Sequence, residues 1–579
     1  MLVFWWYVCD AAGMYVRTTQ RRNKDGSVVR YVQLAHNRRS GAATQAEVLV
    51  NLGREDSVDV DGLRRLARSI SRYLGEAAAE EVPAGAEGAE GMSVESSRPL
   101  GAAWLLDGLW RQLGVDRALA EAVGGRRFTT DVERVLFALV ANRAIAPSSK
   151  LAAAEWAGAD VAVPGLDGMD DDQAYRAMDV LVDADAQAKV QEAVFFSVAN
   201  LLNLEVDLLF FDTTSTYFER DDEETGEGAF RVYGHSKDHR ADLPQIVIGL
   251  AVTREGIPVR VWVWPGNTAD AALLPQVKDD LRDWKLGRVV TVVDRGFSSD
   301  ANLAYLSRAG GQWIAGERMR DGSPDAQAAL SRQGRYQQVR DNLRVKEVRV
   351  GNGDAARRFV ICHNPVEAER DKTRRDTTVA KGEAELGRIE VERAKAKKTS
   401  KAKRDKESSG HRKAECALRD HPSMGRYLRQ LPSGRLVIDR AKIRAEERLD
   451  GKFLLSTSDP DLSAEDVALG YKNLLEAERG FRDLKTTLEL RPVYHRIEPR
   501  IRAHVLLCWL ALLLVRVAER RTGETWRRIN LELGRLHEVT LTGPAGRVAQ
   551  TTEPTDTQRH LLNAAGVAAP PRITTLEPA

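Results

Sequence analysis

The chain has 579 residues, enough for several domains, and its 43% hydrophobic and 29% charged residues are typical of a globular protein in water. A net charge of +2 excludes a uniformly basic surface, so any contact with a polyanion must use local clusters. The four cysteines are scattered without a CxxC pair, which argues against a zinc ribbon or a disulfide framework and favours a reducing cytoplasm. The longest apolar run, 505–515, has eleven residues against the roughly 20 of a membrane-spanning helix, so we expect a buried core helix and no membrane contact.

The first 205 residues divide into a β-rich part and a helical part. Short strands over 14–55 and helical spacing over 61–74 predict a small β/α unit at 14–74. Residues 75–97 are rich in Ala, Glu and Gly without periodicity, which predicts a linker. Apolar residues recur every three to four positions over 98–205 and predict a helical region. The break at 146–149 permits a helix-turn-helix, but an ordinary corner between two helices is the more common cause of such a break.

The region 206–330 changes to an alternation of strands and helices. Buried strands are predicted at 206–218, 288–293 and 311–316, and two more over 246–263 with a turn between them. Helices are predicted at 273–284 and 299–309. The resulting order, β-ββ-α-β-α-β, predicts an α/β fold with a mixed sheet and helices on its faces.

The next region is strongly charged. Strands are predicted at 335–363 and 434–456, on either side of a charged helical stretch at 366–420. Within that stretch, 393–413 holds ten Lys or Arg against two acids. A solvated charged helix and a clamp on a DNA backbone explain this cluster equally well. A helical region at 457–537 follows, and the Pro- and Thr-rich tail at 538–579 is expected to be loosely ordered.

Three carboxylates stand where a purely structural role explains them poorly. Asp212 lies inside the buried strand at 206–218, where an unpaired charge costs several kcal/mol. Asp294 ends the strand at 288–293, and ligands gather at the carboxyl ends of strands in open α/β sheets. Tyr471, Glu478 and Lys485 follow one another at steps of seven, which would place a phenol, a carboxylate and an ammonium on one face of a helix.

The three carboxylates suit two Mg²⁺ or Mn²⁺ ions, because hard cations prefer oxygen ligands. Two such ions, roughly 4 Å apart, can activate an attacking oxygen and stabilise the leaving oxygen of a phosphodiester. The basic residues nearby, Arg295, Arg482 and Lys485, would face the phosphates. Singly, each carboxylate has a simpler explanation: a hydrogen bond to a neighbouring threonine, a turn, or an ion pair on a helix surface. Together they favour the metal site.

With these residues the chain resembles the DDE-type transposases of bacterial insertion sequences, whose catalytic domain has a ribonuclease H-like fold. Asp212, Asp294 and Glu478 match the family's triad. Other stretches also resemble this kind of transposase, in the order 17–36, 233–259, 264–270, 292–297 and 450–514. The family-like sequence begins at Met14, so we expect a chain that starts there to fold and to bind DNA without residues 1–13.

One large group of the family carries a signature of Tyr, two residues, Arg, three residues, Glu, six residues and Lys. Tyr471, Glu478 and Lys485 match it in type and spacing, whereas Leu474 stands at the arginine position. The departure removes one expected phosphate or metal-site contact. Arg482, one turn beyond Glu478, is the candidate to compensate for it.

The resemblance implies a transposase that binds the terminal inverted repeats of its own element. It would cut double-stranded DNA with two Mg²⁺ (or Mn²⁺) ions per active site and join the 3′-hydroxyl to target DNA. The triad would hold the metals, and Tyr471, Lys485, Arg295 and Arg482 would contact DNA. Acting on two ends implies a homodimer in the assembled complex, and a cytoplasmic protein associated with the nucleoid.

The resemblance also implies a domain order. Because 184 residues separate Asp294 from Glu478, against 82 between the two aspartates, an inserted β-rich subdomain would occupy 331–456. It would divide the ribonuclease H-like core into parts at 206–330 and 457–537, and most end recognition would come from residues 14–205, with 98–205 as the helical DNA-binding region. Two alternatives stay open: a ribonuclease H-like nuclease that does not join strands, and an inactive DNA-binding derivative of a transposase.

Overall fold

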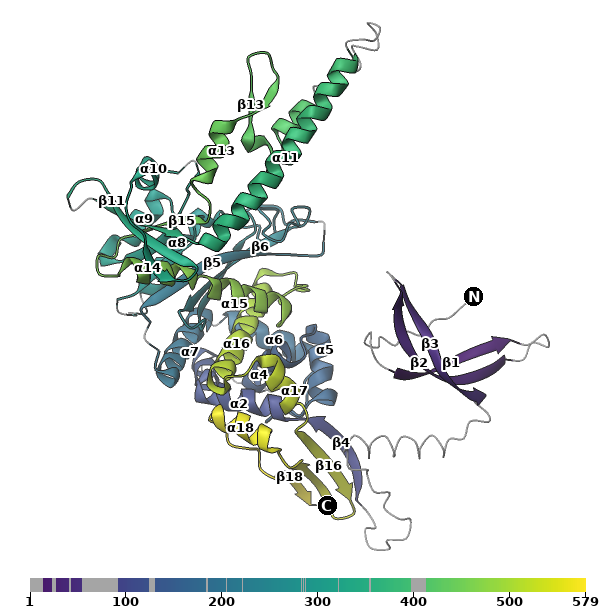
Figure 1. The fold of residues 1–579 in the computed structure, drawn as a ribbon. Coiled ribbons are helices and arrows are strands. Elements are labelled where there is room, and N and C mark those ends of the chain that lie inside the picture. The colour runs from purple at the N-terminus through teal and green to yellow at the C-terminus, as the bar shows by residue number, and fades with distance from the viewer. Residues whose placement is uncertain are drawn as a thin grey trace. The chain divides into compact units, whose positions relative to one another are not determined.

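The structure is a computed structural model, and the chain forms two compact units, Met1–Glu90 and Gly91–Ala579, which are described separately (Figure 1). It describes residues 14–22, 28–40, 43–54, 92–123, 131–183, 186–204, 206–220, 222–282, 284, 286, 288–320, 322–353, 356–396 and 413–578. Residues 1–13, the helix expected at 61–74, most of the expected linker and most of the basic cluster at 393–413 lie outside these ranges.

The first unit contains a three-stranded antiparallel sheet in the order β1-β2-β3. Its strands are β1 (Met14–Arg22), β2 (Val28–Ser40) and β3 (Ala43–Arg54). Arg17 pairs with Gln33 across β1 and β2, and its Nε donates to the Gln33 Oε1 over 3.1 Å. The small amino-terminal sheet expected from the alternating strands is therefore confirmed.

The second unit is organised around a nine-stranded mixed sheet in the order β10-β11-β12-β15-β9-β8-β5-β6-β7. Strand β8 runs parallel to β5 on one side and to β9 on the other. All other neighbouring pairs in the sheet are antiparallel. The strands are β5 (Leu208–Tyr217), β6 (Gln245–Thr253), β7 (Pro258–Pro265), β8 (Val290–Val293), β9 (Gln312–Glu317), β10 (Gln337–Arg340), β11 (Leu343–Val350), β12 (Arg357–His363) and β15 (Lys452–Thr457). Along the chain, the strands from β5 to β9 and the helices between them follow the order β-ββ-α-β-α-β expected for the ribonuclease H-like fold.

Both faces of this sheet are covered, as the near-continuous apolar strands require. Phe210 and Phe211 point to opposite faces because side chains alternate along a strand. Phe211 packs in a cluster with α8 (Asp270–Arg282) and α9 (Asp300–Leu306). Phe210 packs in the larger cluster with α14 (Ala464–Lys472), α15 (Leu475–Thr486) and α16 (Glu498–Thr522).

A helical region packs around α16 and continues the larger cluster (Figure 1). Its helices are α2 (Gly101–Gln112), α3 (Val115–Val123), α4 (Val132–Ile145), α5 (Lys150–Glu155), α6 (Asp171–Asp183) and α7 (Ala186–Leu202). Helix α4 is buried from Arg134 to Ala144, and α5 has only six residues. The break at 146–149 forms a half-buried corner between α4 and α5, and the helix-turn-helix interpretation stays a prediction.

Helix α16 is a core helix that is longer than the sequence indicated. It has 25 residues, and among the described residues it is the one helix long and apolar enough to cross a membrane. However, 94% of its most apolar stretch is buried inside the protein. The expectation of a buried core helix agrees with this packing, but the apolar run of eleven residues underestimated its length.

The region 331–456, expected as an inserted β-rich subdomain, shares one sheet with residues 206–330. Strands β10, β11, β12 and β15 extend the same sheet that carries β5 and β8. Residues 440–447, expected as strand, form the helix α13 (Arg440–Glu447). A long helix, α11 (Pro365–Ala396), projects from the sheet with α13 and the hairpin of β13 (Leu428–Gln430) and β14 (Leu436–Ile438) beside it (Figure 1). The remaining short helix of this region is α10 (Pro324–Ser331).

The expectation of a loosely ordered tail is wrong. After α17 (Trp526–Leu533), residues from 537 onward form β16 (His537–Gly543), β17 (Gly546–Thr551), α18 (Asp556–Ala564) and β18 (Ile573–Pro578). These strands make a four-stranded sheet with β4 (Ser93–Pro99), which was expected to belong to the linker. The partner strand lies more than 400 residues away, so no local pattern could reveal the pairing.

Candidate active site

Two of the three predicted carboxylates meet at the centre of the nine-stranded sheet. Strands β5 and β8 are parallel neighbours in which Phe211 pairs with Val293. The next residues along the two strands are Asp212 and Asp294, so their Cα atoms lie about one strand spacing apart, roughly 5 Å. Both side chains are half-buried. Asp212, inside β5, and Asp294, directly after the end of β8, therefore lie side by side.

Asp212 carries a proton more readily than an ordinary aspartate. The pKa of its carboxyl is raised to about 6, mainly by burial and also by the nearby Asp294 and Asp270 carboxylates. The Lys237 ammonium and a hydrogen bond from the Thr213 backbone N–H, 2.7 Å from Oδ1, act in the opposite direction. Crowding of carboxylates in a partly buried place is the condition that a bound cation relieves.

Asp294 is fixed by the Tyr471 hydroxyl, which donates to its Oδ1 over 2.7 Å. Burial raises the pKa of the Tyr471 phenol, and the Asp294 carboxylate raises it further, so the phenol keeps its proton and remains a donor. Gly316 on β9 leaves room for this contact, because a Cβ there would overlap the Tyr471 hydroxyl. A residue expected to contact DNA therefore holds one of the predicted metal ligands.

Glu478 is not brought into the same cluster. Its side chain is exposed on α15, and the described residues contain no group of three His, Cys, Asp or Glu side chains arranged to hold a metal. Helix α15 nevertheless packs on β5 and β6, the strand of Asp212 and its neighbour. A Cβ on Gly480 would lie 2.8 Å from Leu250 on β6, so the helix approaches the sheet closely two residues from Glu478.

The stretch 471–485 is two helices, which corrects the expectation of one polar face. Tyr471 lies in the last turn of α14, whereas Glu478 and Lys485 lie on α15. Between them, the Leu474 N–H bonds to the Tyr471 carbonyl and the Ala477 N–H to the Leu474 carbonyl, both over 3.0 Å. These i to i+3 bonds tighten the turn and change the direction in which later side chains point. Leu474 is 7% exposed within the larger apolar cluster.

Lys485 forms hydrogen bonds within the protein. Its Nζ donates to the Thr214 Oγ1 over 2.7 Å and to the Asp238 Oδ1 over 2.8 Å. Burial lowers the pKa of Lys485, while the hydrogen bond to Asp238 raises it. Arg491 lies 2.9 Å from the other Asp238 oxygen, an ion pair outside hydrogen-bond alignment.

A second charged network lies on the opposite side of β5. The Lys237 Nζ donates to the Thr213 carbonyl over 2.8 Å and to its Oγ1 over 2.5 Å, and lies 3.1 Å from an Asp270 oxygen. The Thr213 Oγ1 in turn donates to the other Asp270 oxygen over 2.7 Å. No role was expected for Lys237, Asp238 or Asp270, although all three belong to stretches that resemble the family. No spacing rule links them to Asp212.

A basic pocket adjoins Asp294 and Tyr471. Its volume is about 590 Å³, and its lining includes Arg295, Arg318 and Lys452. Arg295 and Arg318 are exposed, as is Arg482 on α15. Phe453, also in the lining, stacks on Tyr471 with ring centroids 6.1 Å apart. The pocket thus combines cations for phosphates with an apolar ring beside a candidate metal ligand.

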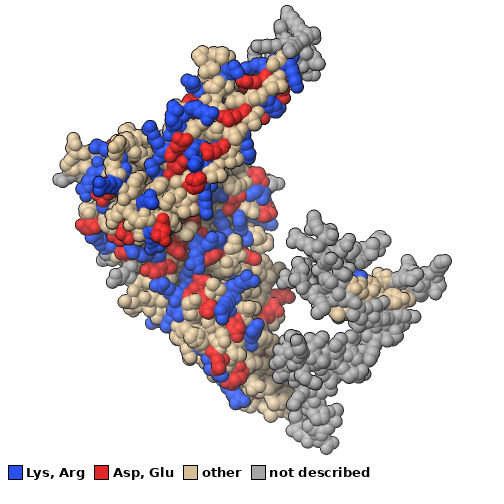
Figure 2. Space-filling view, viewed as in Figure 1, with Lys and Arg blue, Asp and Glu red and all other residues tan. Residues whose placement is uncertain are grey.

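The donor set fits hard divalent cations. Asp212 and Asp294 offer carboxylate oxygens side by side, and their crowding favours a positive charge between them. Glu478 would need its side chain to turn from solvent toward the strands. Charges of both signs are interleaved over the face shown in Figure 2, so the local arginines and lysines, not a general basic surface, are available for DNA.

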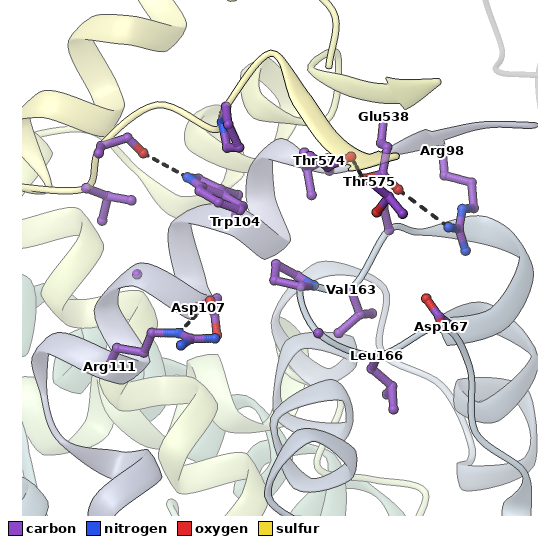
Figure 3. A pocket seen from close by; sticks show the side chains of 18 of the residues that line it. Arg98, Trp104, Asp107, Arg111, Val163, Leu166, Asp167, Glu538, Thr574 and Thr575 are labelled. Atoms are coloured by element: carbon purple, nitrogen blue, oxygen red, sulfur yellow. Dashed lines mark hydrogen bonds and ion pairs between the residues drawn. The ribbon is translucent and has the colours of Figure 1, made fainter. Parts of the chain in front are cut away.

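A second pocket lies away from these residues and has a structural explanation. It has a volume of about 600 Å³ between α2, the 162–167 loop and the carboxyl-terminal segments (Figure 3). Four of the charged groups in its lining form two pairs: Arg111 donates to Asp107 over 2.9 Å, and Arg98 lies 3.6 Å from Glu538. The Trp104 indole donates to the Ala568 carbonyl over 2.8 Å. These contacts hold the last residues of the chain against α2.

Comparisons with known proteins identify the family of the chain. Residues 207–514, more than half of the chain, match the model of the transposase DDE domain, and residues 16–82 match that of the IS1634 family transposase N-terminal domain. No curated protein matched the chain. A cryo-EM structure of the piggyBac transposase synaptic complex with hairpin DNA is 10% identical, with 75% of this chain and 78% of that chain covered and a TM-score of 0.35. That likeness is too slight to bear on the fold or the site. On the strength of the matched DDE domain, the chain belongs to the DDE-type insertion-sequence transposases.

Proposed function

We propose that this transposase binds the terminal inverted repeats of its element, cleaves DNA at the ends with two divalent metals, and transfers the strands to target DNA. The observation that supports the proposal most directly is the pair of aspartates on neighbouring parallel strands, one of them hydrogen-bonded by Tyr471. Asp212, Asp294 and Glu478 would hold two Mg²⁺ or Mn²⁺ ions. When bound, such ions activate the attacking oxygen and stabilise the leaving oxygen of the phosphodiester.

The protein's own residues would prepare that chemistry. The phenol of Tyr471 keeps Asp294 oriented, and the Lys237 ammonium partly offsets the negative charge around Asp212. Asp212 must lose its proton to bind a cation, and the cation itself would lower the pKa that burial has raised. Glu478 would complete the site from the α15 side.

DNA would approach along the exposed cations. Arg295 beside Asp294 and Arg482 beside Glu478 are exposed and suited to phosphate contacts. Lys485 uses two of its three N–H groups on Thr214 and Asp238, which leaves one for a phosphate. Tyr471 would contact DNA through its ring edge while its hydroxyl stays on Asp294. We further propose that two copies act on the two element ends, and that the protein works at the nucleoid in the cytoplasm.

The test uses the full chain and DNA that carries the inverted repeats flanking its gene. With Mg²⁺ the wild type should nick at the repeat ends, and with precut ends it should yield joined products. Cleavage without joining would instead identify a ribonuclease H-like nuclease. Repeat binding with no cleavage in either Mg²⁺ or Mn²⁺ would identify an inactive derivative. If Asp294→Asn left metal-dependent cleavage unchanged, the site assignment would be wrong.

A further inference from the structure

The connection between β5 and β6 folds back over the strand that carries Asp212. The Lys237 backbone N–H donates to the Ser215 Oγ over 2.8 Å, which anchors the connection three residues beyond Asp212. From this point two consecutive side chains reach different partners. Lys237 binds Thr213 and Asp270, and Asp238 binds Lys485 and Arg491. The connection therefore links β5 to two helices.

The two partners lie on opposite faces of the sheet. Side chains alternate along a strand, so Thr213 faces the side of α8, where Asp270 begins the helix, and Thr214 faces the side of α15. Asp212 shares the face of Thr214 by the same alternation. The Asp238 side of the connection is thus the side on which Glu478 must meet Asp212.

Asp238 makes the most enclosed of these links. Its side chain is 13% exposed and that of Lys485 is 11% exposed. Their hydrogen bond of 2.8 Å and the bond from Lys485 to Thr214 of 2.7 Å join the connection, α15 and β5 at one point. Arg491, which follows α15, meets the same carboxylate. When one partner of an enclosed ion pair is removed, the other charge is left without compensation, so such links are costly to break.

We propose that Asp238 is a positioning residue, which acts through Lys485 to hold α15, and with it Glu478, against the strand that carries Asp212. Asp238 touches neither metal nor DNA in this role. The inference rests on the proposed function, because Glu478 matters only if the three carboxylates share a metal site. It assigns the signature lysine a partner inside the protein in addition to any phosphate contact.

The experiment compares wild type with Asp238→Asn, which keeps the shape of the side chain and removes its charge. Cleavage should fall about 10- to 100-fold, the usual effect of removing a group that orients a metal ligand, and the Mg²⁺ concentration for half-maximal cleavage should rise. Binding of repeat DNA in EDTA should stay within about twofold, and Asp238→Glu should recover part of the activity. Asp242→Asn is the matched control, because Asp242 lies in the same connection but pairs with Arg240 at the surface.

A second measurement works without activity. Amide hydrogen exchange across 475–486 should be faster in Asp238→Asn than in wild type or Asp242→Asn, since α15 loses an anchor. In Lys485→Met, the further change Asp238→Asn should add little to the loss of cleavage. Unchanged exchange and unchanged Mg²⁺ dependence, or additive losses in the double variant, would overturn the positioning role. If the wild type cleaves nothing, the proposed function fails, and the exchange data still decide whether Asp238 anchors α15.

Discussion

The strand-borne and helix-borne carboxylates of the candidate site are held in different ways. Asp212 and Asp294 occupy neighbouring positions on parallel strands, where the backbone ladder fixes their spacing. Glu478 is exposed on α15, and the placement of that helix depends on side-chain contacts, including those of Lys485. The sheet thus positions two of the three proposed ligands, and tertiary packing positions the third. Substitutions at the strands should act on the chemistry, whereas substitutions around α14 and α15 should act on stability and geometry.

The largest effect should come from Asp212→Asn and Asp294→Asn. Each change removes a charge that the divalent ions need, so cleavage should fall by about 10³-fold or more, which corresponds to about 4 kcal/mol of transition-state stabilisation. Thermal unfolding should change little, because both side chains are only half-buried. Initial rates of Mg²⁺-dependent nicking measure the effect. The control is Asp300, which begins α9 after β8 and has a side chain that is 85% exposed. Asp300→Asn should cleave at the wild-type rate.

The next effect tests whether the departure from the family signature is a lost contact or a core position. Leu474 is 7% exposed in the apolar cluster, so Leu474→Arg places a guanidinium where no partner is available among its apolar neighbours. We expect it to lower the free energy of unfolding by about 3 kcal/mol and not to raise cleavage. Denaturant unfolding of the full chain measures the loss. A stable and more active Leu474→Arg would show that the position faces the metal site.

The same contrast explains what could be read from the sequence. The strand pattern and the residue types placed Asp212 and Asp294 correctly, because burial on both faces and the end of a strand leave local signals. The step of seven from Tyr471 to Lys485 wrongly predicted a single helical face, because a turn of two residues separates α14 from α15. Asp238 and Asp270 reach the site through contacts between distant segments. The β4 to β16 pairing spans most of the chain, and no periodicity encodes it.

A smaller effect concerns the buried cluster beneath the segment that follows α15. Lys150 lies 3.5 Å from the His504 Nδ1, and the His504 Nε2 is 3.0 Å from the Leu490 carbonyl. The pKa of Lys150 is lowered to about 7, mainly by burial and also by the nearby Arg143. The unfolded chain, with an ordinary lysine pKa, binds more protons above pH 7, so the free energy of unfolding should rise with pH.

The contribution of Lys150 should appear from about pH 7 to about pH 9, and comparison with Lys150→Met separates it from the other lysines whose pKa values burial lowers, Lys278, Lys346, Lys452 and Lys485. His495 and His504 have lowered pKa values, so their contribution is complete below this window, and Cys508, whose pKa burial raises, would ionise in the unfolded chain only near its upper end. The slope should reach at most about 1.4 kcal/mol per pH unit, and Lys150→Met should flatten it. Denaturant unfolding at pH 7, 8 and 9 measures both. An equal slope in the variant would assign the pH dependence to other groups.

The smallest effect should come from Tyr471→Phe, which tests how firmly the sheet alone holds Asp294. The change removes the 2.7 Å hydrogen bond to the Asp294 Oδ1 and keeps the ring that stacks on Phe453. A single hydrogen bond contributes about 1 kcal/mol, so cleavage should fall about fivefold while DNA binding in EDTA and thermal unfolding stay close to wild type. If cleavage fell as far as in Asp294→Asn, the backbone ladder would not be sufficient to place that carboxylate, and the contrast between strand-borne and helix-borne ligands would fail.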